Sequence, residues 1–126
     1  MKKKMTILLV ATMMIMVISS LSVMAYDESS TPAGQYGILT GSNNGDLIAT
    51  DVTTNDGSGR LLNGYEVRDN ITGSLYEAAS GITSPWGALR LLTNTNAWDY
   101  PYPCAVYGSH EVRGNLTRGV HTVTVY

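Results

Sequence analysis

Turn-forming residues interrupt this chain so often that no segment beyond residue 25 carries the pattern of a long helix. Glycine recurs every several residues, and the segments between the glycines are rich in Thr, Val, Tyr and Ile. Such residues pack well on a pleated sheet, whereas scattered glycines weaken a helix. Short strands at roughly ten-residue spacing predict an all-β fold. We expect a small antiparallel β-sandwich, or a partly closed barrel, of about 6–8 short strands in a single domain at 35–126.

The most distinctive turn is Asn44-Gly45, because this pair supplies the positive φ angles of a tight hairpin. Strands are therefore predicted at 35–42 and 47–53. A closing hairpin is predicted from 104–113 and 119–126.

The middle of the chain leaves alternatives open. A strand is predicted at 61–69, and 70–78 either continues it past a bend or returns as a fourth strand after a tight turn, which we favour. Residues 86–92 fit a short helix or a strand. Residues 94–103 are expected to be irregular, because two alternating prolines cannot donate to a β-ladder.

The first 25 residues carry the three-part pattern of an export signal. Lysines at 2–4 precede an apolar run at 7–18, and Val23 and Ala25 suit a signal-peptidase site. We predict a cleaved signal peptide at 1–25, a flexible tail at 26–34 and a secreted product. The alternative is an uncleaved N-terminal membrane anchor, although the apolar run is shorter than the roughly 20 residues of a spanning helix.

Charge and cysteine content narrow the function classes. Residues 26–126 hold five Arg against ten acidic residues, so their formal charge is −5. Nucleic-acid binding is not expected, since it needs a basic surface. The one cysteine, Cys104, cannot form an internal disulfide, which favours bacterial export over a eukaryotic secretory route. Cys104 is expected to be a buried free thiol, with a Cys104-linked dimer as the alternative.

No metal, cofactor or catalytic motif is assembled in the sequence. If Gly114 pairs with Gly119, His110 and His121 become diagonal neighbours on one face of the closing hairpin, whereas Glu111 points to the other face. No ligand pair has a usual zinc spacing. Nucleophile-elbow, phosphate-loop and dinucleotide motifs are absent, so we predict neither a cofactor nor enzymatic activity.

Aromatic residues are the most informative candidates for a ligand site. They gather in and just after the irregular segment, and exposed Tyr and Trp give rigid contact surfaces for sugars or proteins. The candidate ligand contacts are Trp98, Tyr100, Tyr102 and Tyr107. Residues 26–126 contain no Phe or Met, so Trp and Tyr must also fill the core, and burial of Trp86 and Trp98 is favoured.

These features predict a secreted, non-catalytic β domain that binds an extracellular glycan or protein. The alternative is a secreted antimicrobial, bacteriocin-like effector, whose size and export route fit. The charge of −5 argues against it, because disruption of anionic membranes favours cationic faces.

Overall fold

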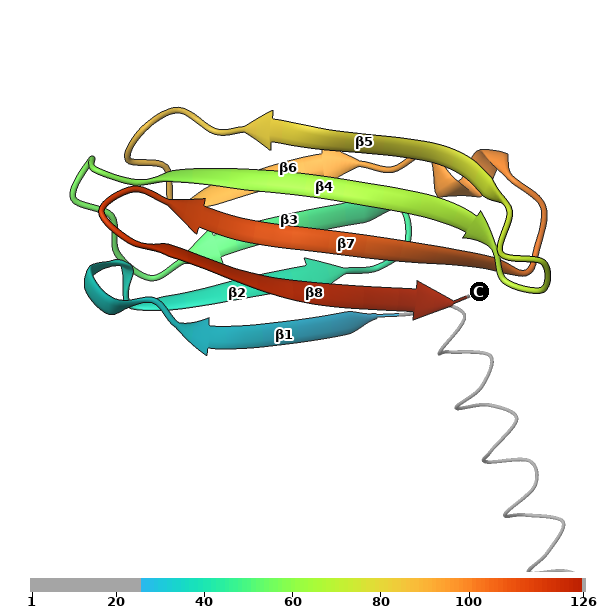
Figure 1. Ribbon diagram of the computed structural model, residues 1–126, viewed down its shortest axis with the longest axis horizontal. Helices are drawn as coiled ribbons and strands as arrows, with labels where there is room; N and C mark the ends of the chain where they lie inside the picture. The colour runs from blue at the N-terminus through green and yellow to red at the C-terminus, as the bar shows by residue number, and fades with distance from the viewer. Residues whose placement is uncertain (1–25, 126) are drawn as a thin grey trace, which may run out of the picture.

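The chain folds into two antiparallel four-stranded sheets packed face to face (Figure 1), as a computed structural model that describes residues 26–125 shows. The strands are β1 (Asp27–Pro32), β2 (Ile38–Asn43), β3 (Leu47–Val52), β4 (Arg60–Asp69), β5 (Leu75–Thr83), β6 (Arg90–Asn94), β7 (Cys104–Arg113) and β8 (Thr117–Val125). Two short 3-10 helices, η1 (Gly34–Tyr36) and η2 (Ala97–Asp99), lie in connections. The strand orders are β1-β2-β3-β6 and β5-β4-β7-β8.

The predicted all-β sandwich is thus confirmed for the described part of the chain. Between residues 26 and 125 no helix is long and apolar enough to cross a membrane. The predicted signal peptide at 1–25 lies outside the described residues.

The prediction of a flexible tail at 26–34 is wrong. Asp27–Pro32 forms β1, which pairs with β2 along its whole length. The Asp27 carboxylate also accepts a hydrogen bond of 2.8 Å from the backbone N–H of Val123 in the other sheet. The segment is polar because β1 is an edge strand with alternating exposure, and edge strands are commonly polar.

The predicted turns hold with small shifts. The tight turn between β2 and β3 is present, and Gly45 supplies its positive φ of 92°, whereas Asn44 does not adopt a positive φ. The chain returns after Asp69 as β5, the favoured alternative, because the Asp69 carboxylate accepts hydrogen bonds from the N–H groups of Ile71 and Thr72. Of the segment 86–92, for which a short helix or a strand was predicted, residues 86–89 lie in the β5–β6 loop and only residues 90–92 belong to a strand, β6.

The core consists of two apolar clusters. The first holds Ala33, Tyr36, Leu39, Val52, Leu61, Val112 and Val120. The second holds Ile48, Tyr65, Val67, Ala97, Cys104 and Val106. Successive inward positions show a buried polar layer between them: Thr50 stands between Ile48 and Val52 on β3, and His110 between Val106 and Val112 on β7.

Hydrogen bonds in this polar layer run in one direction across the sandwich. The Thr50 hydroxyl donates to the Asn63 amide oxygen, and the Asn63 amide nitrogen donates to Thr93 Oγ1 at 2.9 Å. His110 Nδ1 lies 3.1 Å from Thr50 Oγ1, and His110 Nε2 lies 2.8 Å from Thr122 Oγ1. Since the Thr50 proton is committed to Asn63, we assign the proton of a neutral His110 to Nδ1, which leaves Nε2 to accept from Thr122.

The predicted register of the closing hairpin is wrong by three residues. His110 pairs with Val120 rather than Val123, and His121 lies opposite Ser109. The turn is shorter than predicted, because Thr117 already pairs with Arg113. An odd shift moves every side chain to the other face. His110 therefore points into the core, His121 lies on the outer face, and the two are not neighbours on one face.

Candidate functional site

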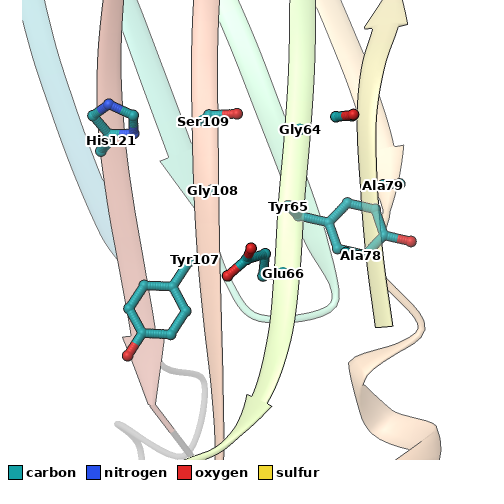
Figure 2. A pocket seen from close by; sticks show the side chains of 10 residues that line it. Gly64, Tyr65, Glu66, Ala78, Ala79, Tyr107, Gly108, Ser109 and His121 are labelled. Carbon is teal, nitrogen blue, oxygen red and sulfur yellow. The ribbon is translucent and has the colours of Figure 1, made fainter. Parts of the chain in front are cut away.

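A groove of about 450 Å³ crosses the outer face of the β5-β4-β7-β8 sheet (Figure 2). Its lining comes from the central parts of all four strands. The lining residues are Gly64, Tyr65, Glu66, Ala78, Ala79, Ser80, Tyr107, Gly108, Ser109 and His121. Because side chains alternate along a strand, only every second residue of a strand points out of the sheet into the groove.

The register arranges the outward side chains in two neighbouring rows. One row runs through Glu66 on β4 and Tyr107 on β7, which lie directly opposite each other. The next row runs through Gly64 on β4, Ser109 on β7 and His121 on β8. Figure 2 shows the Glu66 carboxylate and the Tyr107 ring on one side of Ser109 and His121. The two rows are two residues apart along each strand, which is about 7 Å, so one small ligand can touch both rows.

The floor of the groove is hollow because Gly64 has no side chain. A Cβ at Gly64 would lie 2.6 Å from Ser109 Oγ and 3.4 Å from the Ala79 carbonyl oxygen. Beside it β5 carries a bulge, because Ser80 and Gly81 together face Gly64, and Gly81 has a φ of 68°. Bulges re-aim side chains and are common beside functional sites. Here the bulge brings Ser80 to the rim.

The polar side chains of the groove fall into two groups, those without a hydrogen-bond partner on the protein and one engaged carboxylate. In the part of the chain that the structure describes, the side chains of Ser80, Ser109, Tyr107 and His121 make no hydrogen bond with another protein group. Glu66 is held by Arg68, whose Nε donates to the carboxylate at 2.8 Å. The groove thus combines an aromatic ring, hydroxyls, an imidazole and a charge-compensated carboxylate.

The four aromatic residues predicted as ligand contacts do not form one surface. Tyr107 lines the groove and is 44% exposed. Trp98 and Tyr102 are also exposed but lie in the β6–β7 connection, with ring centroids 6.3 Å apart and nearly perpendicular planes. Tyr100 is half-buried and stacks on Tyr76 at 5.0 Å, as part of the packing around the second core cluster.

The expected burial of Trp86 and Trp98 is wrong. Their exposed fractions are 58% and 48%. The core instead takes Tyr36, Tyr65, aliphatic residues and the polar layer around His110. A thin sandwich with a central hydrogen-bonded layer leaves little room for indole rings. Trp86 instead lies in the β5–β6 loop beneath the guanidinium of Arg60, whose Cζ is 4.7 Å from the ring centroid.

Cys104 is a buried free thiol at the start of β7, as expected. Burial raises the pKa of this thiol, and the nearby Asp69 carboxylate adds to the effect. A raised pKa disfavours the reactive thiolate. An intermolecular disulfide at Cys104 would require the second core cluster to open.

No group of three His, Cys, Asp or Glu residues that could hold a metal ion is found between residues 26 and 125. Of the acidic residues, Asp51 on β3 forms an ion pair with Arg90 on β6, with Arg90 Nε 2.6 Å from Asp51 Oδ1. Asp56 accepts hydrogen bonds from Ser58, which lower the pKa of its carboxyl.

Several groove residues escaped sequence reasoning. Gly64, Glu66, Ser80 and Ser109 are ordinary strand residues, and only their side-by-side register makes a site of them. The alternation of Gly64 and Glu66 on the outward side of a predicted strand was the available signal. The bulge that brings in Ser80 had none.

No protein-family model matches the chain, and no curated protein matches it. Among solved structures, the chain is similar to a DUF3244 family protein with an immunoglobulin-like β-sandwich fold from Bacteroides vulgatus. The match has a TM-score of 0.34 and 10% identity, and it covers 81% of this chain and 94% of that one.

Proposed function

We propose that the chain is a secreted, non-catalytic β domain that binds an extracellular glycan in the groove of the β5-β4-β7-β8 sheet. The observation that supports this most is the pairing of the exposed Tyr107 ring with unpartnered hydroxyl and imidazole groups around the Gly64 hollow. A sugar presents C–H groups that pack on an aromatic face and hydroxyls that donate and accept hydrogen bonds. Secretion rests on the export pattern at 1–25.

A binding role fits the groove better than hydrolysis. A Ser-His-acid triad needs the imidazole between the hydroxyl and the carboxylate. Here Ser109 on β7 stands between His121 on β8 and Glu66 on β4, so the order is different. Glu66 is also already engaged by Arg68. Strand positions such as Ser109 offer no nest of free N–H groups for an oxyanion, because their backbone is paired on both sides.

The test is retention of the purified full-length chain on a panel of cell-wall fragments and oligosaccharides, followed by titration of the best ligand. We expect Tyr107→Ala to weaken binding about 5- to 30-fold, since removal of one packed aromatic contact costs roughly 1–2 kcal/mol. Gly64→Val is expected to weaken binding similarly by filling the hollow. Its new Cβ meets the mobile end of Ser109, so the fold should persist.

Tyr102→Ala is the matched control, because this exposed tyrosine lies outside the groove. If Tyr102→Ala removes binding and Tyr107→Ala does not, the site lies in the β6–β7 connection and the groove assignment is wrong. Absence of retention on every glycan rejects the proposed function. Growth inhibition of related strains by the same preparation would support the effector alternative.

A further inference from the structure

Arg60, at the start of β4, lies on the same outer face as the groove. Leu61 is fully buried, so its neighbour Arg60 points outward, in the alternation that also brings Gly64 and Glu66 to this face. Arg60 and Gly64 are four residues apart, which is about 13 Å along a strand. The half-buried Leu62 lies between them. A linear ligand seated over Gly64 can therefore run along β4 to Arg60.

Arg60 has no carboxylate partner in the described part of the chain. Arg68, Arg90 and Arg113 pair with Glu66, Asp51 and Glu111 respectively. The guanidinium of Arg60 makes neither an ion pair nor a hydrogen bond there, and its Nε is shielded from solvent without a partner. Leaving a shielded cationic N–H group without a hydrogen-bond partner costs free energy. The Arg60 guanidinium is therefore suited to bind an acidic group of a ligand.

The surroundings hold the guanidinium in place without neutralising it. Its Cζ lies 4.7 Å from the centroid of the exposed Trp86 ring, a cation–π contact. Arg113 lies directly opposite Arg60 on β7, so two like charges face each other across the strands. Glu111 compensates only Arg113, since both of its carboxylate oxygens lie 3.1 Å from Arg113 Nη2. The pair of Arg60 and Arg113 therefore keeps an excess positive charge.

We propose that Arg60, presented on Trp86 beside Arg113, is a subsite for the carboxylate of an acidic sugar, and that the ligand of the groove is a carboxylate-bearing glycan. The inference rests on the proposed function and specifies its ligand class. A guanidinium offers two parallel N–H groups that match a carboxylate. Residues 26–126 carry a net charge of −5, so recognition depends on this local pair and not on the field of the whole protein.

The experiment compares one glycan in two forms: a uronic-acid oligosaccharide and the same oligosaccharide with its carboxyl groups reduced to alcohols. Affinities of the full-length chain for both are measured at low and at high salt. We expect the acidic form to bind about tenfold more tightly at low salt, with the preference shrinking at high salt. Arg60→Gln should abolish the preference, because it weakens binding of the acidic form more than binding of the neutral form.

Arg90→Gln is the matched control, because it removes the same charge from the opposite sheet. It should leave the preference intact, and equal losses in both variants would show a general charge effect and overturn the subsite. Equal wild-type affinity for the two forms overturns the inference while the proposed function stands. Binding of neither form, with no other glycan retained, overturns both. Tighter binding of an acidic peptide than of any glycan also overturns the assigned ligand class.

Discussion

The two ends of the sandwich are closed in different ways (Figure 1). The Tyr36 end comprises the loops at 33–37, 53–59, 84–89 and 114–116, and the Trp98 end comprises those at 44–46, 70–74 and 95–103. At the Tyr36 end a buried tyrosine anchors the loops. Its hydroxyl lies 2.9 Å from Ser58 Oγ and accepts a hydrogen bond of 3.1 Å from the N–H of Asn115. The Asn55 amide also donates to the carbonyls of Gly59 and Ala88.

The Trp98 end uses aromatic rings on its surface. Tyr76 and Tyr100 stack in parallel, while Trp98 and Tyr102 meet edge to face and remain exposed. Fewer hydrogen bonds tie its loops together; one joins the N–H of Asn70 to the carbonyl of Pro103 at 3.0 Å. The difference shows that aromatic packing at this end adds to polar anchors such as Asp69 and Thr95, whereas the Tyr36 end relies mainly on hydrogen bonds.

Acid is expected to have the largest effect on the free energy of unfolding. His110 lies between the two core clusters, one of which underlies each end. Burial lowers the pKa of His110 to about 4, and His121 adds slightly, against a backbone hydrogen bond to Ala49 and the Asp27 and Asp51 carboxylates. Between pH 6.5 and about 4 the unfolded chain binds the proton and the folded chain does not. Stability therefore falls as the pH is lowered through this window, by roughly 3 kcal/mol in total.

Chemical denaturation between pH 4 and 7 measures this slope. His110→Gln should flatten it, whereas His121→Gln, which removes only a minor influence on His110, should change it far less. If His110→Gln does not fold, NMR titration of the wild-type ring replaces it. A His110 resonance that titrates near pH 6.5 would contradict the buried neutral assignment.

Removing one hydroxyl from each end should have a smaller and unequal effect. Tyr36→Phe leaves the Asn115 N–H without its partner in a half-buried site, so we expect a loss of about 1–2 kcal/mol. Tyr76→Phe removes a hydrogen bond of 3.1 Å to Asp69, whose carboxylate keeps the N–H groups of Ile71 and Thr72. We expect a loss under about 1 kcal/mol there. Equal shifts in urea midpoint would remove the distinction between the ends.

The smallest effect is expected for an apolar side chain at the tip of the Trp98 end. Ile71 is 78% exposed in the β4–β5 turn, so Ile71→Ala should change the free energy of unfolding by less than about 0.5 kcal/mol. Thermal unfolding of the two proteins side by side measures it. A loss above about 1 kcal/mol would mean that this end has packing comparable to the Tyr36 end.

The fold class was predictable because local chemistry determines it. Asn44-Gly45 dictates a tight turn, and the Thr, Val and Tyr between glycines favour strands. Strand β1 was missed because polar edge strands look like tails. The hairpin register was missed because β7 and β8 both alternate along their length, so a slip of three residues looks equally regular in sequence.

The site was predictable only in part. Tyr107 was identified by its type and its neighbourhood, and it lines the groove. Its partners Gly64, Glu66 and Ser109 come from strands whose pairing joins residues far apart in sequence. Burial of the two Trp was mispredicted because composition cannot show that a buried His110 network occupies the middle of the core.

The placement of those two indoles has a spectroscopic consequence. The chain has two Trp in all, one in the β5–β6 loop of the Tyr36 end and one in the η2 segment of the Trp98 end, and both are partly exposed. Each end therefore carries its own intrinsic fluorophore. Trp86→Phe leaves emission from the Trp98 end alone, and Trp98→Phe leaves an indole that lies under the Arg60 cation. Quenching and emission wavelength can then follow each end separately, without an attached label.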